Sequence, residues 1–271
     1  KTLGDNIKTF AFITNTLAKD KSINDKIRDF EHPVQSRNVA NLIEDEVVES
    51  LTETVKLNYP DISHRYYKYK AKLFNKEYLD YWDRNAPLPK SIDRKIPWLE
   101  AKDVVLTAYR NFSVQMADIA ELFFDNNWID AAVTKGKDSG AFSHSASPDV
   151  HPYILLNYQG NVRDVMTLAH ELGHGIHQYL AKEQGYLMAG TPLTFAETAS
   201  IFGEQLTFQA LLERCQSNDE KQIMIASKVE DMINTIVRQI AFFEFEKRVH
   251  NQRQQGELSV QALSEIWISV Q

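Results

Sequence analysis

The residues His170-Glu171-Leu172-Gly173-His174 form the pattern in this chain that is best suited to chemistry. Two histidines four positions apart on a helix project from the same side, because four residues make slightly more than one turn. Their imidazoles can bind one metal ion, and Glu171 lies at the edge of that face, where it can take a proton from a metal-bound water. This H-E-x-x-H arrangement is typical of zinc-dependent peptidases. Catalytic zinc also needs another protein ligand and an open position for water.

Glu197 is the candidate for that further ligand, near the start of a second predicted helix at about 195–213. The same residues allow a structural interpretation, because Thr194-x-x-Glu197 also fits a capping box. A glutamate in the first turn is favoured by the helix dipole as well. These residues by themselves leave the ligand and the capping interpretation equally open.

A third histidine ligand is excluded by pattern. Peptidases with H-E-x-x-H-x-x-G-x-x-H have Gly and His where this chain has His177 and Leu180. His177 lies seven residues after His170, about 10 Å along the helix axis. It is better interpreted as a residue that supports the ligands or faces the substrate.

The metal helix is predicted over about 162–182. Its apolar residues recur at helical spacing and predict a buried stripe, made of Val165, Leu168, Leu172, Ile176 and Tyr179. Gly173 and Gly175 lie inside this predicted helix, and each lowers helix stability by roughly 1 kcal/mol relative to alanine. We therefore expect another backbone or a substrate to approach the helix there.

Support for the metal ligands is predicted on the second helix. Ser200 and Glu204 follow Glu197 by three and seven residues, on the same helix face. Histidine ligands usually donate their other ring N–H to a carboxylate or carbonyl. We expect Glu204 to play this part, with Ser200 and His177 as weaker candidates.

A small antiparallel sheet is predicted immediately before the metal helix, from the short apolar runs 141–144 and 153–158. The second run is expected to be an edge strand, to which an extended peptide can add main-chain hydrogen bonds. The proposed substrate contacts are Gly140, Ala141, Phe142, Asn157 and Tyr158.

Composition places the chain among ordinary globular proteins, with 271 residues, 43% hydrophobic and 25% charged. No apolar run approaches the roughly 18 residues of a membrane span. The net charge of −7 argues against nucleic-acid and anionic-membrane partners. The single cysteine, Cys215, excludes an internal disulfide, and its polar neighbours argue against a catalytic thiol. It is compatible with a reducing compartment, and we expect a cytoplasmic protein.

The chain is expected to form one predominantly helical module over 1–271. The proline-rich loop 84–97 is the best candidate for an internal boundary. Further helices are predicted at about 5–20, 34–58, 63–70, 97–111, 114–126 and 220–253. Both ends look cut, since the chain begins at Lys1 without an initiator Met and stops within a predicted helix. The oligomeric state is not readable from these residues.

The metal segment, His170 to Gln178, followed by Phe195-Ala196-Glu197-Thr198-Ala199-Ser200, resembles the oligoendopeptidase F branch of the thimet-oligopeptidase-like zinc metallopeptidases. Five further segments resemble this family in the expected order: Ser63-His64-Arg65-Tyr66-Tyr67, Tyr81-Trp82-Asp83-Arg84, Gly140-Ala141-Phe142, Leu155-Leu156-Asn157-Tyr158 and Phe242-Phe243-Glu244-Phe245-Glu246.

This resemblance implies a mainly α, zincin-type catalytic domain with one small antiparallel sheet beside the metal helix. It implies one Zn²⁺ ion held by His170, His174 and Glu197, with Glu171 as the general base. The implied activity is hydrolysis of internal bonds in short, unstructured peptides by metal-activated water. Family members are longer at both ends, and the residues that bind peptide and the oxyanion in their C-terminal segment have no counterpart here.

Two alternatives stay open. One is a metallocarboxypeptidase of related fold, which would remove single C-terminal residues. The other is a truncated, metal-stabilised helical domain that binds peptide or a partner chain without turnover. The intact Glu171 argues against the second alternative, because a structural zinc site needs no base.

Overall fold

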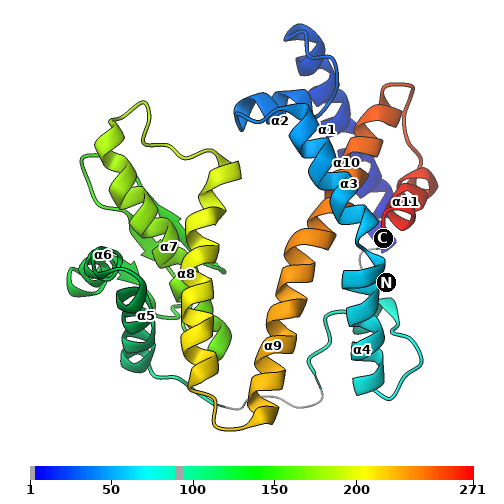
Figure 1. The fold of residues 1–271 in the computed structure, drawn as a ribbon. Coiled ribbons are helices and arrows are strands. Elements are labelled where there is room, and N and C mark those ends of the chain that lie inside the picture. Colours follow the sequence, from blue (N-terminus) through cyan, green and yellow to red (C-terminus); the bar gives the residue numbers. More distant parts are fainter. Residues whose placement is uncertain (1–3, 89–93) are drawn as a thin grey trace. The chain divides into compact units, whose positions relative to one another are not determined.

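The computed structural model describes residues 4–88 and 94–271, and these are mainly helical with one small sheet (Figure 1). The α-helices are α1 (Ile7–Ile27), α2 (Gln35–Ala40), α3 (Asp45–Leu57), α4 (Arg65–Leu73), α5 (Trp98–Phe112), α6 (Val114–Asp125), α7 (Val162–Ala181), α8 (Leu193–Glu213), α9 (Asn218–Ile233), α10 (Gln239–Arg253) and α11 (Val260–Ser269). The short helical turns are η1 (Gly4–Asn6), η2 (Pro60–His64), η3 (Tyr81–Asp83), η4 (Lys182–Gln184) and η5 (Asn234–Arg238), of which η2 and η5 are π-helical. Among the described residues, no helix is both long and apolar enough to cross a membrane.

The chain divides into two compact units. The first consists of residues 1–90 and 225–271, and the second of residues 91–224. One division lies within the loop 84–97, where the sequence suggests a boundary. The other lies within α9, where the helical pattern continues without a break. The interpretation of 1–271 as one catalytic module stays a prediction.

In the first unit, the predicted helix over 34–58 is wrong, because the structure has two helices there, α2 and α3. The chain turns between them, and Leu42 has a φ of +54°. The side chain of Asp45 spans this turn: it accepts hydrogen bonds from Asn38 Nδ2 (2.6 Å) and pairs with His32 Nε2 (2.7 Å). The hydrogen bonds from Asn38 and, to a smaller extent, from His32 lower the pKa of Asp45. A helical stripe of apolar residues does not reveal such a polar contact.

The second unit contains the main core, in which α5, α6, α7 and α8 surround a continuous cluster of buried apolar side chains. Three residues of the predicted stripe on α7, Val165, Leu168 and Leu172, are fully buried. The helix begins with a capping box, in which Asp164 Oδ2 accepts from the backbone N–H of Asn161 at 2.9 Å. The position of the predicted metal helix is therefore confirmed.

Glycines bring α7 and α8 unusually close. A Cβ placed on Gly173 would lie 2.5 Å from the carbonyl oxygen of Ala199 and 2.7 Å from Cα of Ser200. The expectation that Gly173 accommodates a neighbouring backbone is confirmed. Gly175 instead accommodates a ring, because a Cβ there would lie 2.8 Å from Phe123.

The sheet is mixed, with strand order β1-β3-β2. Strand β2 (Phe142–His144) is antiparallel to β3 (Tyr153–Leu155), as predicted, but β1 (Ile129–Asp130) pairs with β3 in parallel. The prediction that the run 153–158 is an edge strand is therefore wrong, since β3 is the central strand. Strand β1 has only two residues and no detectable alternation, so the sequence does not reveal it.

A buried hydroxyl group ties α5 to the metal helix. The side chain of Tyr109 is fully buried, and its hydroxyl donates a 2.6 Å hydrogen bond to the carbonyl oxygen of Ala169. Gly203 leaves room for this contact, because a Cβ there would collide with the Tyr109 hydroxyl and lie 3.1 Å from Ala169 O. Three helices thus meet one residue before His170.

We expect Gly203→Ala to destabilise the protein by about 1–3 kcal/mol through overpacking. Tyr109→Phe should cost about 1 kcal/mol for the lost hydrogen bond. The double variant should lose less than the sum, because removing the hydroxyl relieves part of the collision. Denaturant unfolding of the four proteins measures this, with Gly190→Ala as a control, since a Cβ there meets nothing within 4 Å. Additive losses would contradict the assigned contact.

Candidate metal centre

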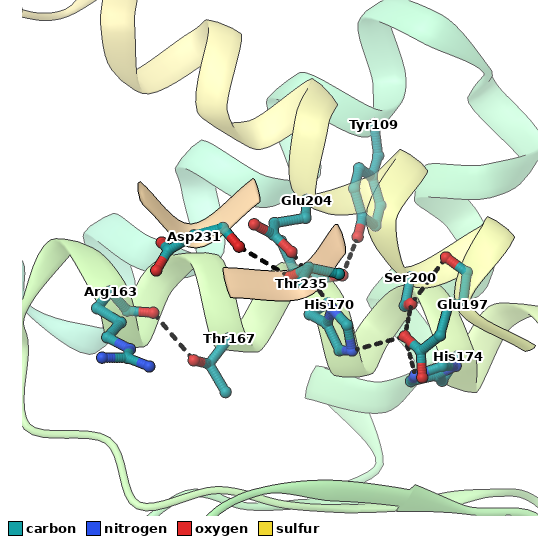
Figure 2. A network of polar contacts seen from close by, with 11 residues as sticks. Tyr109, Arg163, Thr167, His170, His174, Glu197, Ser200, Glu204, Asp231 and Thr235 are labelled. Carbon is teal, nitrogen blue, oxygen red and sulfur yellow. Dashed lines mark hydrogen bonds and ion pairs between the residues drawn. The ribbon is translucent and has the colours of Figure 1, made fainter. Parts of the chain in front are cut away.

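The two histidines of α7 and one glutamate of α8 converge on one point (Figure 2). The Nε2 atom of His170 lies 3.2 Å from Glu197 Oε2, and that of His174 lies 3.4 Å from the same oxygen. One ligand atom from each of the three residues lies within 4.8 Å of the others. The structure therefore brings together the three predicted metal ligands.

These separations are those expected of side chains that share one metal ion. Zinc ligands at their usual bond lengths in a tetrahedron are about 3.3 Å apart. Two nitrogens and one carboxylate oxygen form a donor set that zinc accepts, so the residues present fit the ion.

The capping interpretation of Glu197 is wrong. Helix α8 begins at Leu193 with Pro192 as its N-cap, and no side chain caps it. Thr194 thus lies inside the first turn, and Glu197 lies too deep in the helix to return to the cap. Its carboxylate is held instead by Ser200, whose Oγ donates to Glu197 Oε2 at 2.7 Å and to the Glu197 carbonyl oxygen at 3.1 Å.

Glu204 lies on the far side of the His170 ring from Glu197. Its Oε2 atom is 3.3 Å from His170 Nδ1. With the proton on Nδ1, the ring donates to Glu204 and directs its Nε2 lone pair toward Glu197, which is the arrangement expected of a metal ligand. Glu204 thus contacts a predicted ligand histidine, as expected, whereas Ser200 contacts Glu197 and not a histidine.

The centre carries an excess of negative charge. Burial raises the pKa of Glu171, the charge of Glu197 adds to this effect, and His170 opposes it. Burial lowers the pKa of His174. For His170, burial acts in the same direction, but the hydrogen bond to Glu204 and the nearby carboxylates outweigh it and raise the pKa. Three carboxylates around two histidines favour a bound divalent cation.

His177 is not part of the metal cluster. It lines an apolar cavity of about 820 Å³ together with residues of α6, α7, α8 and the loop between the last two. Other residues around this cavity include Met116, Leu180, Phe195 and Phe202. A role for His177 in supporting ligands or facing substrate stays a prediction.

The proposed substrate contacts have structural partners. Asn157 Nδ2 donates to the carbonyl oxygens of Asp138 (2.9 Å) and Gly140 (3.0 Å), and Tyr158 donates to Ile96 O at 2.6 Å. These bonds secure the loops that surround β3. Phe142 lies half-exposed on β2, with Ala141 before it partly buried against the core. Substrate contact by any of these five residues stays a prediction.

Gln178 connects α7 to the sheet and was not predicted. Its Nε2 donates to Ser143 O at 3.2 Å, and Ser143 Oγ donates to Gln178 Oε1 at 2.9 Å. Gln178 follows His174 by four residues, so helical spacing places it on the same helix face. Tyr109 was not predicted either, because no local pattern indicates a hydrogen bond across 60 residues.

A sequence model of Peptidase family M3 matches residues 5–271. The chain is 30% identical over 258 residues to oligopeptidase PepF of Bacillus subtilis, covering 95% of this chain and 38% of that protein. It is 34% identical over 228 residues to an oligoendopeptidase F homolog of Borreliella burgdorferi, covering 83% and 38% respectively. The chain thus spans less than half the length of these relatives.

Solved structures agree with this fold. A crystal structure from Chlamydophila abortus has a TM-score of 0.84 at 28% identity, covering 99% of this chain and 45% of that one. The oligoendopeptidase-F of Enterococcus faecium has a TM-score of 0.67, covering 98% and 40%. At 20% identity, the second likeness concerns the fold alone.

We expect Ser200→Ala and Glu204→Gln to weaken zinc binding about 10–100-fold each, because each removes a group that orients a ligand. Competition with a chromophoric chelator measures the dissociation constant. Ser264→Ala and Glu213→Gln, on exposed positions outside the centre, should leave it unchanged. An unchanged affinity in the first pair would show that these contacts do not orient the ligands.

Gly173→Ala is expected to weaken zinc binding as well, although residue 173 is not a ligand. The added Cβ must displace the backbone of Ala199 and Ser200, and this moves Glu197 relative to the two histidines. The same chelator competition should detect at least a tenfold loss, consistent with the effect of disturbing ligand orientation by about 10–100-fold. Gly190→Ala is the matched control, and equal affinities in the two variants would refute the argument.

Proposed function

Because the chain belongs to peptidase family M3, we propose that it carries the catalytic centre of a zinc-dependent oligopeptidase. Such a peptidase hydrolyses internal bonds of short, unstructured peptides. The observation that carries the proposal is the convergence of His170, His174 and Glu197 within 4.8 Å, with the buried carboxylate of Glu171 on the same helix. The names of the relatives, oligopeptidase and oligoendopeptidase, support the substrate class.

His170, His174 and Glu197 would hold one zinc ion. When bound there, zinc supplies a Lewis acid for the scissile carbonyl and lowers the pKa of a water. Within the chain, Glu204 keeps the His170 ring in the tautomer that a ligand needs, and Ser200 keeps the Glu197 carboxylate pointing toward α7. These contacts fix the positions of the ligands before substrate arrives.

Glu171 is the proposed general base. Its side chain is only 7% exposed, and burial raises its pKa. A carboxylate with a raised pKa accepts a proton from the attacking water more readily than an ordinary one. The protonated carboxyl then delivers this proton to the leaving amine, so that Glu171 ends the cycle as it began.

The cellular setting of the protein is proposed from its cysteine and its net charge. Cys215 is a free thiol, which supports a reducing compartment, and we place the protein in the cytoplasm. Short peptides are the proposed partners. The acidic net charge of −7 gives no reason to add nucleic acid or anionic membranes.

We expect the zinc-loaded protein to cut an unstructured peptide of about ten residues into internal fragments. Glu171→Gln should reduce this rate by about 10²–10⁴-fold, the usual contribution of a general base, while zinc stays bound. The control is Glu183→Gln, at an exposed position just after α7. Mass spectrometry of the peptide, with and without a chelator, measures the products, and elemental analysis measures the zinc.

The products also separate the alternatives. Loss of single C-terminal residues in succession would identify a metallocarboxypeptidase. An untouched peptide with zinc still bound would indicate a peptide-binding domain without turnover. Full activity of Glu171→Gln would refute the assigned base.

A further inference from the structure

Two arginines of the first unit have buried N–H groups that no described residue satisfies. Among the described residues, three buried side-chain polar atoms lack a hydrogen-bond partner, namely Arg84 Nε, Arg238 Nη1 and Thr207 Oγ1. Native proteins leave few buried donors unpaired, and a missing ion or water is a common reason for those that are. That two of the three belong to arginines of one unit therefore points to an anion.

The two guanidinium groups lie within reach of each other's charge. Burial lowers the pKa of Arg238, and the charge of Arg84 is the next cause. Both also act on Tyr67 of α4: burial raises the pKa of the Tyr67 hydroxyl, while Arg84 and Arg238 oppose this rise. The charge of Glu230 also raises the pKa of Tyr67, so two cations, one phenol hydroxyl and one carboxylate lie in one region.

The carboxylates nearby in the chain are already engaged. Glu230 pairs with the fully buried Lys70 at 2.7 Å and accepts from the Tyr66 hydroxyl at 2.9 Å. Asp83, next to Arg84, pairs with Lys76. Each of these carboxylates therefore already has a cationic partner, and within the described residues neither forms an ion pair with Arg84 or Arg238.

Each guanidinium group has a contact that leaves some of its N–H donors unused. Arg84 uses Nη1 to donate to Gln271 Oε1 at 3.2 Å, and its buried Nε has no hydrogen-bond partner among the described residues. Arg238 lies 5.0 Å above the centroid of the Phe242 ring, a contact that uses no N–H group. Arg238 also ends the π-helical turn η5, and such turns occur frequently at functional sites.

We propose that Arg84, Arg238 and Tyr67 form a binding site for a carboxylate group. The planar donors of a guanidinium match the two oxygens of a carboxylate, and the Nε edge of Arg84 is the edge that such a pair would use. The carboxylate belongs either to a small organic acid or to the C-terminus of a peptide. The site is separate from the residues of the metal centre and does not depend on the proposed peptidase activity.

The test is the thermal unfolding midpoint of the whole 271-residue chain in sodium acetate and in sodium chloride at equal ionic strength. Acetate at about five times its dissociation constant should raise the midpoint by about 2–4 °C relative to chloride. Arg84→Gln and Arg238→Gln should each abolish this rise. Arg248→Gln is the matched control, because Arg248 already donates to Glu244 (3.3 Å) and Ser269 (3.0 Å), and it should keep the rise.

Three results would overturn the proposal: an equal effect of chloride, a rise that persists in both variants, or a rise lost equally in the control. If a glutamine variant does not fold, Arg84→Lys takes its place, since lysine keeps the charge but lacks the planar fork. It should lose most of the acetate effect, and a full effect would overturn the assignment.

A second arm identifies the source of the carboxylate. Zinc is removed with 1,10-phenanthroline, which carries no carboxylate, so that peptides are not cut. An N-acetylated pentapeptide with a free C-terminus is then compared with its C-terminal amide. Protection by the acid at lower concentration than acetate, without protection by the amide, identifies a peptide terminus. Protection by the acid no better than by acetate identifies small organic acids, and equal protection by the amide would overturn the proposal.

Discussion

The close approach of α7 and α8 at Gly173 is the constraint on which the metal centre depends. Two of the proposed ligands belong to one helix and the third to the other, so their separations follow from how these two backbones pack. A side chain at position 173 would meet the Ala199 carbonyl at 2.5 Å. The helix accepts a poor helix former there, because a third ligand held by the neighbouring backbone requires that contact.

Around this contact, hydrogen bonds from polar side chains fix the groups of the metal centre. Tyr109 binds the carbonyl next to His170, Ser200 binds Glu197, and Glu204 binds His170. The side chains of Tyr109 and Ser200 are fully buried, so their hydrogen bonds are stronger than they would be in water. The resulting centre holds more carboxylate charge than its histidines balance, which suits a divalent cation.

The helical part of this fold was largely readable from the sequence. The apolar stripe of α7 and the strands β2 and β3 follow from local periodicity. The predictions failed where a contact between residues distant in sequence determines a helix boundary or the strand order. Asp45 separates α2 from α3 through Asn38 and His32, and a two-residue strand, β1, makes β3 central rather than an edge.

For the metal centre, the sequence alone determined that His170 and His174 share one helix face with Glu171 beside them, because helical geometry relates residues four apart. The sequence did not decide whether Glu197 is a metal ligand or a helix cap. It also did not decide whether a neighbouring backbone or a substrate approaches Gly173. Only the tertiary structure excludes the cap and places the backbone of Ala199 and Ser200 against Gly173. The start of α8 at Leu193 and its contact with Gly173 depend on packing between segments that no local pattern relates.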